Sequence, residues 1–154
     1  HSFPTRRSSD LEIDEIFSDK ILSESEILFV NDFNSKVLIN KGSEFEQINL
    51  PLMSQIAPVR DIQILDYNKD DIEDILLVGN NSNVSTYFGS FESSYGALLE
   101  GNGDGTFNYI NQKNSGLKLR GDMTKVLPLD KNKSKFVIGI NNDKISIIGL
   151  DNEK

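Results

Sequence analysis

The sequence predicts an all-β fold built from repeated sheet units, with one short helix near its start. Short apolar runs rich in β-branched residues, such as 75–78 and 136–140, alternate with clusters of Gly, Asn and Asp that are typical of turns. Related segments also recur about 60 residues apart. Because units of that length with about four short strands are typical of a propeller blade or a similar all-β array, we expect a partial β-propeller with antiparallel four-stranded blades or an array of that kind.

Two pairs of segments carry this repeat. Residues 37–45 and 97–107 both predict a strand, a Gly turn and a second strand that opens with Phe, at offsets of 60 to 62. The second pair consists of residues 65–80 and 129–141. Its offset is 64 residues at the start of the two segments and 61 at their end. The repeat unit is therefore about 60 residues long, and the chain holds parts of more than one unit.

Residues 1–11 differ from the rest. They read HSFPTRRSSDL, which resembles the translation of a common sequencing adapter, so we expect them to be non-native. The authentic N-terminus, with any signal peptide, would then be missing. Without this segment the formal net charge changes from −8 to −9, and the only histidine, His1, is lost.

Charge and composition exclude several classes of function. An acidic chain without a basic stripe is repelled by nucleic acid and by anionic membrane surfaces. The chain has no Cys and no His beyond residue 1, so it lacks the parts of a Ser-His-Asp or Cys-His nucleophile and of an ordinary zinc site. No apolar run approaches the roughly 20 residues that cross a bilayer. We expect no enzymatic activity, no nucleic-acid partner and no membrane insertion.

Residues 66–74, which read DYNKDDIED, carry the most specific chemistry. Oxygen-bearing side chains at the first, third, fifth and ninth positions can converge on a hard divalent cation, since calcium takes six to eight oxygen ligands. An EF-hand does not fit, because its sixth position should be Gly and is Asp71, and its twelfth should be Glu and is Leu77. The flanking segments also predict strands, so we expect a strand, the loop and a strand.

These residues and those that follow resemble a known family. The spacing Asp-x-Asn-x-Asp-x-x-x-Asp from residue 66, then SYGALL at 94–99 and GNGDGTF at 101–107, resembles the FG-GAP/VCBS repeats of integrin-α-type β-propellers. With the lead-in QIAPVR at 55–60, the order is similar to the C-terminal part of bacterial ASPIC/UnbV-like and cartilage-acidic-protein-like proteins. The resemblance covers roughly residues 27–150.

The resemblance implies a calcium (Ca2+) site that orders the hairpin. The implied ligands are four side chains and the main-chain carbonyl of residue 72: Asp66, Asn68, Asp70, Ile72 and Asp74. Five carboxylates within nine residues repel one another without a cation, so binding should stabilise the fold. The family usually has Gly at the position of Asp71, where the turn favours positive φ, and Asp tolerates this better than most residues. The alternative is an acidic surface turn without an ion.

The resemblance also implies a division into blades. The first expected segment, 12–50, has a helix at 12–22 and the outer strands of an incomplete blade at 36–40 and 45–48. The second, 51–112, is a complete blade with strands at 62–65, 75–79, 96–100 and 107–110. The third, 113–154, has three strands, at 124–129, 136–140 and 145–148. Propellers commonly close their ring with a strand from the other terminus, so the missing fourth strand of the last blade would come from the absent N-terminus. The C-terminus near residue 154 would then be the authentic end of the protein. The helix would pack on the propeller rim, with a recognition helix as the alternative.

Three further segments invite functional interpretation. Residues 130–135 replace the loop carboxylates with Ser and Lys, so we expect no ion there. The glycine-rich residues 101–105 fit a tight hairpin turn better than a ligand site. Residues 80–94, with the aromatic residues Tyr87, Phe88, Phe91 and the adjacent Tyr95, predict either a binding surface or packing over the blade edge.

Together these patterns predict a non-catalytic, calcium-stabilised propeller segment of a secreted or cell-surface protein, serving as a scaffold for protein or glycan contact. A propeller lectin is the first alternative. A carboxylate-dependent hydrolase is the second, although the acidic residues share one loop instead of flanking a cleft.

Overall fold

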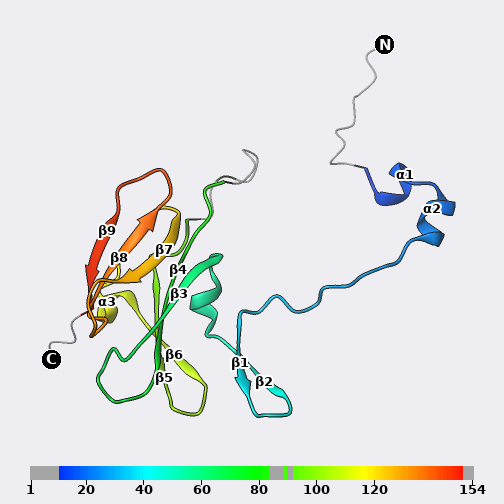
Figure 1. Cartoon of the computed structure of the whole chain (residues 1–154). Helices are drawn as coiled ribbons and strands as arrows, with labels where there is room; N and C mark the ends of the chain where they lie inside the picture. Colours follow the sequence, from blue (N-terminus) through cyan, green and yellow to red (C-terminus); the bar gives the residue numbers. More distant parts are fainter. Residues whose placement is uncertain (1–10, 84–88, 90–91, 151–154) are drawn as a thin grey trace. The chain divides into compact units, whose positions relative to one another are not determined.

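The computed structural model describes residues 11–83, 89 and 92–150, and the chain divides into two compact units, His1–Phe33 and Asn34–Lys154 (Figure 1). All but Leu11 of the adapter-like segment lies outside the described residues.

The described part of the first unit contains α1 (Ile13–Ile16) and α2 (Asp19–Glu24), so the prediction of a single helix over 12–22 is wrong. Phe17 and Ser18 adopt extended backbone, with ψ of 142° and 153°, and separate the two helices. Ser favours such a cap position over a helix interior because its hydroxyl competes for backbone hydrogen bonds. The apolar side chains of the predicted helix face are exposed by 45–64%: Ile13, Ile16, Phe17 and Ile21. No helix in the described ranges is long and apolar enough to span a membrane.

The described residues of the second unit form three antiparallel sheets, in which each strand pairs with its neighbours in the sequence. The strands are β1 (Lys36–Asn40) and β2 (Phe45–Asn49); β3 (Val59–Leu65), β4 (Asp74–Gly79), β5 (Ala97–Gly101) and β6 (Phe107–Ile110); and β7 (Met123–Pro128), β8 (Lys135–Ile140) and β9 (Ser146–Gly149). These strands lie where the sequence predicts strands, and the all-β prediction is confirmed. Short helical turns, η2 (Leu52–Gln55) and α3 (Gln112–Ser115), connect sheets. The described residues form no closed ring of sheets, so the propeller remains a prediction.

The two central strands of the four-stranded sheet β3–β6, β4 and β5, are buried on both faces (Figure 1 shows the strand order). Leu76 and Val78 of β4 point to a core shared with Val126, Phe136 and Ile138 of the β7–β9 sheet. Leu77, between them, points to the opposite face and a second cluster against which β1 packs. This two-sided burial explains why β4 is an unbroken apolar run instead of an alternating one.

The second and third sheets repeat the same details. Their first strands, β3 and β7, lie next to each other, and each has a register shift, at Val59/Asp61 and at Met123/Lys125. The second strand of each sheet is followed by an Asn whose N–H donates to the residue just before the first strand: Asn80 to the Pro58 carbonyl and Asn141 to the Asp122 carbonyl. The matching positions agree with the offsets of 64 and 61 in the sequence.

Candidate metal loop and adjoining groove

The candidate metal loop closes the hairpin between β3 and β4. Leu65 pairs with Asp74, so residues 66–73 form the connection. Two of them have positive φ: Lys69 at 63° and Asp71 at 64°. The prediction of positive φ at residue 71 is confirmed. The second left-handed residue, Lys69, was not foreseen, because nothing in the side chain of Lys favours this conformation.

Three of the predicted ligands direct their oxygens to the loop's own backbone. The Asp66 carboxylate accepts hydrogen bonds from the N–H groups of Asp70 and Asp71, both at 3.1 Å. Asn68 Oδ1 also accepts from Asp70 N–H, at 3.1 Å, and Asp70 Oδ1 accepts from Ile72 N–H, at 2.8 Å. The side chains at the first, third and fifth positions thus wind around one short stretch of backbone.

Asp74, the fourth side chain of the predicted set, lies at the base of the loop and is fully buried. Its Oδ2 accepts from Tyr67 N–H at 2.7 Å, and its Oδ1 accepts from Gly101 N–H at 2.8 Å. Burial raises the pKa of Asp74 above its ordinary value despite these two bonds, and the charges of Asp70 and Asp66 raise it further. The negative charges of Asp70 and Asp66 thus act against ionisation of the buried Asp74.

The end of β5 contacts the loop through two residues that the sequence analysis missed. Glu100 Oε1 accepts a hydrogen bond of 2.9 Å from Asn68 Nδ2, which also donates to Asp70 Oδ2 at 2.7 Å. Gly101 lies so near the loop that a Cβ there would come within 2.3 Å of the Glu73 carbonyl oxygen. No local pattern could have identified them, because their role depends on how β5 pairs with β4.

The donor chemistry of this loop fits calcium. Every candidate ligand offers oxygen, which hard cations prefer, and a bound cation would offset the charges of Asp70 and Asp66 that act on the buried Asp74. Ile72, expected to act through its carbonyl, uses its N–H within the loop. In the ranges that the structure describes, no three or more His, Cys, Asp or Glu side chains are grouped to hold a metal ion.

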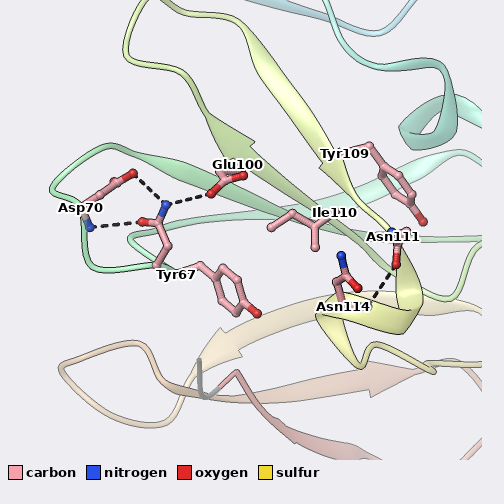
Figure 2. Close-up of a pocket in the computed structure, with 8 residues that line it drawn as sticks. Tyr67, Asp70, Glu100, Tyr109, Ile110, Asn111 and Asn114 are labelled. Carbon is pink, nitrogen blue, oxygen red and sulfur yellow. Dashed lines mark hydrogen bonds between the residues drawn. The ribbon is translucent and has the colours of Figure 1, made fainter. Parts of the chain in front are cut away.

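An open groove of about 680 Å³ adjoins the loop (Figure 2). Asp70 and Glu100 lie at one end with the Asn68 amide between them, Ile110 lies in the middle, and Asn111 and Asn114 of the α3 turn lie at the other end. The aromatic residues Tyr67 and Tyr109 complete the lining. The groove thus offers hydrogen-bonding groups at both ends and apolar surface between them.

The corresponding loop between β7 and β8 is organised differently. The Asp130 carboxylate accepts from the Ser134 N–H at 2.8 Å and from the Ser134 hydroxyl at 2.5 Å, and these bonds lower the pKa of Asp130. Lys133 Nζ reaches β3 and donates to the Ile64 carbonyl at 2.6 Å. An ammonium group therefore lies at the side of this loop that faces the candidate metal loop.

The glycine-rich segment 101–105 forms the β5–β6 hairpin turn, as predicted. Asn102 N–H donates to the Thr106 carbonyl at 3.0 Å, and Gly103 and Gly105 have φ of 79° and 89°. The segment is thus a turn that Gly makes possible by its backbone freedom.

The predicted binding surface at 80–94 is described only in part. Tyr87, Phe88 and Phe91 lie outside the described residues. Asn80 is fully buried and closes the base of the segment by bonds to both the N–H and the carbonyl of Ser94, at 3.0 and 2.8 Å. The adjacent Tyr95 is 37% exposed, and the Arg120 guanidinium lies 5.8 Å from its ring centre. This contact occupies one face of the Tyr95 ring.

Fold and loop together define the class of this chain: stacked antiparallel sheets with an acidic, oxygen-rich hairpin loop. Comparisons of the chain with known protein families, with curated proteins and with solved structures found no match.

Proposed function

We propose that this chain is part of a calcium-binding β-propeller of the FG-GAP/VCBS type that acts as a non-catalytic scaffold. The observation that carries the proposal is the candidate metal loop, in which Asp66, Asn68 and Asp70 wind around one stretch of backbone beside the buried Asp74. The stacked sheets support it, since a propeller repeats one sheet unit around an axis and here the first strands β3 and β7 lie next to each other with matching register shifts.

Calcium supplies charge neutralisation in this proposal. The ion is held by Asp66, Asn68, Asp70, the Ile72 carbonyl and Asp74. Its attraction for these groups offsets the effect of the Asp66 and Asp70 charges on Asp74. An affinity of about 10⁻⁴–10⁻³ M suits the calcium concentrations outside cells, so the protein is proposed to be secreted or held on the cell surface. Its partner is a protein or a glycan, together with the remaining blades of its own chain.

Thermal unfolding followed by circular dichroism tests the calcium site. At ten times its dissociation constant, calcium should stabilise the full chain by about 1.4 kcal/mol, which raises Tm by several degrees above the value in chelator. Asp66→Ala should abolish this rise. Asp143→Ala, which removes the same charge from the turn between β8 and β9, should retain it. Equal Tm values in calcium and chelator for the unaltered chain would refute the site.

The groove favours a lectin, which binds glycans, as the second candidate function. Aromatic rings stack on sugar faces, and amide and carboxylate groups bind sugar hydroxyls, and all of these line the groove. Glycan-array binding that Tyr67→Ala removes, while Tyr95→Ala does not, would support a lectin. Binding unaffected by Tyr67→Ala would exclude the groove as the sugar site.

A further inference from the structure

We infer that Asn132, in the turn between β7 and β8, is an acceptor site for an N-linked oligosaccharide. The chain contains three Asn-x-Ser sequences, the minimal acceptor for N-glycosylation, which begin at Asn80, Asn83 and Asn132. The sequence by itself does not distinguish among them. The inference rests on the proposed secreted or surface location, because proteins receive this modification on the secretory route.

The fold excludes the first of these sequences. Asn80 is fully buried, and its side-chain NH2 donates to the carbonyls of Ser94 and Gly121, both at 2.8 Å. An N-linked sugar would replace one of these two hydrogens and would need space that a close-packed interior does not offer. A folded chain therefore cannot carry an oligosaccharide at this position. The second sequence, at Asn83, extends into residues 84 and 85, which lie outside the described residues.

Asn132 has the opposite environment. It lies in a tight turn and is exposed. Among the residues that the structure describes, none forms a hydrogen bond or an ion pair with its side chain. The amide is thus open to an enzyme in solution, and its modification breaks no hydrogen bond of the fold.

The neighbours of Asn132 shape the turn without involving its side chain. The Asp130 carbonyl accepts from the Lys133 N–H at 3.2 Å, and the Asp130 carboxylate accepts from the N–H and the hydroxyl of Ser134 at 2.8 and 2.5 Å. Lys133 Nζ holds the turn to β3 through the Ile64 carbonyl. These bonds leave the Asn132 side chain projecting from the turn, so a bulky group on it displaces none of them.

The modification joins the side chain of Asn132 to C1 of a sugar. Asn132 Nδ2 attacks C1 of the donor, a polyprenyl-diphosphate-linked oligosaccharide, and the bond from C1 to the diphosphate oxygen breaks. The amide loses one proton, and the lipid diphosphate leaves with the electron pair of the broken bond. The transferase also requires a hydroxyl two residues after the Asn, which Ser134 provides.

An oligosaccharide on Asn132 would lie beside the candidate metal loop. Asn132 and Lys133 line a cavity of about 550 Å³ together with Asp66 and Asp71 of that loop. A bulky, hydrated sugar at this position would shield both hairpin loops from other proteins. Protein partners would then contact other surfaces of the second unit.

Mass spectrometry of the full chain, secreted from eukaryotic cells behind an added signal peptide, tests the inference. The chain with Asn83→Gln should gain the mass of one oligosaccharide, which peptide-N-glycosidase removes. Addition of Asn132→Gln should abolish this gain. Addition of Ser134→Thr, which retains the hydroxyl, should preserve it. In protein freed of sugar, Asn132→Gln should leave Tm unchanged, which separates loss of the site from loss of the fold.

Two outcomes would overturn the inference. One is a secreted chain that carries no sugar on Asn132. The other is a mass gain that persists when Asn83→Gln and Asn132→Gln are combined, which would place the sugar on a different residue.

A second measurement distinguishes failure of this inference from failure of the proposed location. Protease added to intact source cells, or analysis of their medium, shows whether the natural protein lies outside the cell. If it does not, while Asn132 carries sugar in the secretion experiment, the acceptor site stands and the proposed location fails. If the protein lies outside the cell and Asn132 carries no sugar in the secretion experiment, the location stands and the acceptor site is wrong.

Discussion

The left-handed residues of the candidate metal loop show how side chains support an unfavourable backbone. Asp71, at φ 64°, donates its N–H to the Asp66 carboxylate. Lys69, at φ 63°, precedes Asp70, whose N–H donates to both Asp66 and Asn68. These bonds offset the cost of roughly 1–2 kcal/mol that a side chain incurs in this conformation. Asp at position 71 therefore does not exclude the turn that Gly usually makes.

Close backbone approach makes a different demand at Gly101. We expect Gly101→Ala to lower the free energy of unfolding by about 2–3 kcal/mol, because its Cβ would overlap the Glu73 carbonyl oxygen and displace the N–H that binds Asp74. Urea unfolding in chelator measures this. Gly139→Ala is the control, since the nearest atom to its Cβ lies at 3.6 Å, and it should change the free energy by less than about 0.5 kcal/mol. Equal effects of the two substitutions would contradict the close approach.

At the scale of elements, β3 and β7 are joined by side chains that bond to backbone. Asp61 Oδ2 of β3 accepts from Val126 N–H at 2.9 Å, and Gln63 Nε2 donates to the Val126 carbonyl at 3.2 Å. Lys125 pairs with Asp61 at 3.1 Å, but its side chain is 60% exposed, so the ion pair contributes little. β3 and β7 belong to different sheets and do not pair through their backbones, so these side-chain hydrogen bonds join them instead.

This contact should make stability depend on acid. Burial acts to raise the pKa of Asp61, but the Val126 N–H and Lys125 outweigh it and hold the pKa below its ordinary value of 3.8. A lowered folded pKa contributes stability above the unfolded pKa that is lost as pH falls through the folded one. We therefore expect the free energy of unfolding in chelator to decrease between about pH 5 and pH 2, and to decrease less in Asp61→Asn.

The measurement is urea unfolding across this pH range. Asn retains an acceptor for the Val126 N–H, so the variant should fold, and the comparison isolates the charge. Asp143→Asn, on an exposed turn, should follow the unaltered chain. Parallel curves for Asp61→Asn and the unaltered chain would show that Asp61 does not contribute to the acid response.

At the scale of the whole molecule, the stack of sheets in the second unit ends on an apolar face. Leu127, Val137 and Ile147 pair across β7, β8 and β9 and form a row on the face opposite the shared core. Leu127 is 48% exposed and Ile147 is 64% exposed. The equivalent face of the β3–β6 sheet is covered by β7–β9.

Such a row should cause concentration-dependent self-association of the isolated chain. We expect the sedimentation coefficient to rise with concentration, and the double substitution Leu127→Lys and Ile147→Lys to suppress the rise with little change in Tm. Met53→Lys, at another exposed apolar side chain, should leave the association intact. A sedimentation coefficient independent of concentration in the unaltered chain would contradict this prediction.

The sequence determined the features that depend on near neighbours. Apolar runs located β4, β5 and β8, Gly and Asn placed the turns, and the spacing of Asp66, Asn68 and Asp70 indicated a loop that winds on itself. It failed at 12–22, where periodicity predicted one helix. In the described part of the first unit the apolar side chains of that face are exposed by 45–64%, so burial does not stabilise Phe17 and Ser18 in a helix.

Only the tertiary structure decided which distant groups meet. Strand pairing brings Glu100 to Asn68 and Gly101 to Asp74, and sheet packing brings Asp61 to Val126. The physical reason is that each contact depends on the register of a strand or on the packing of two sheets. Many residues set these jointly, and no local spacing encodes them.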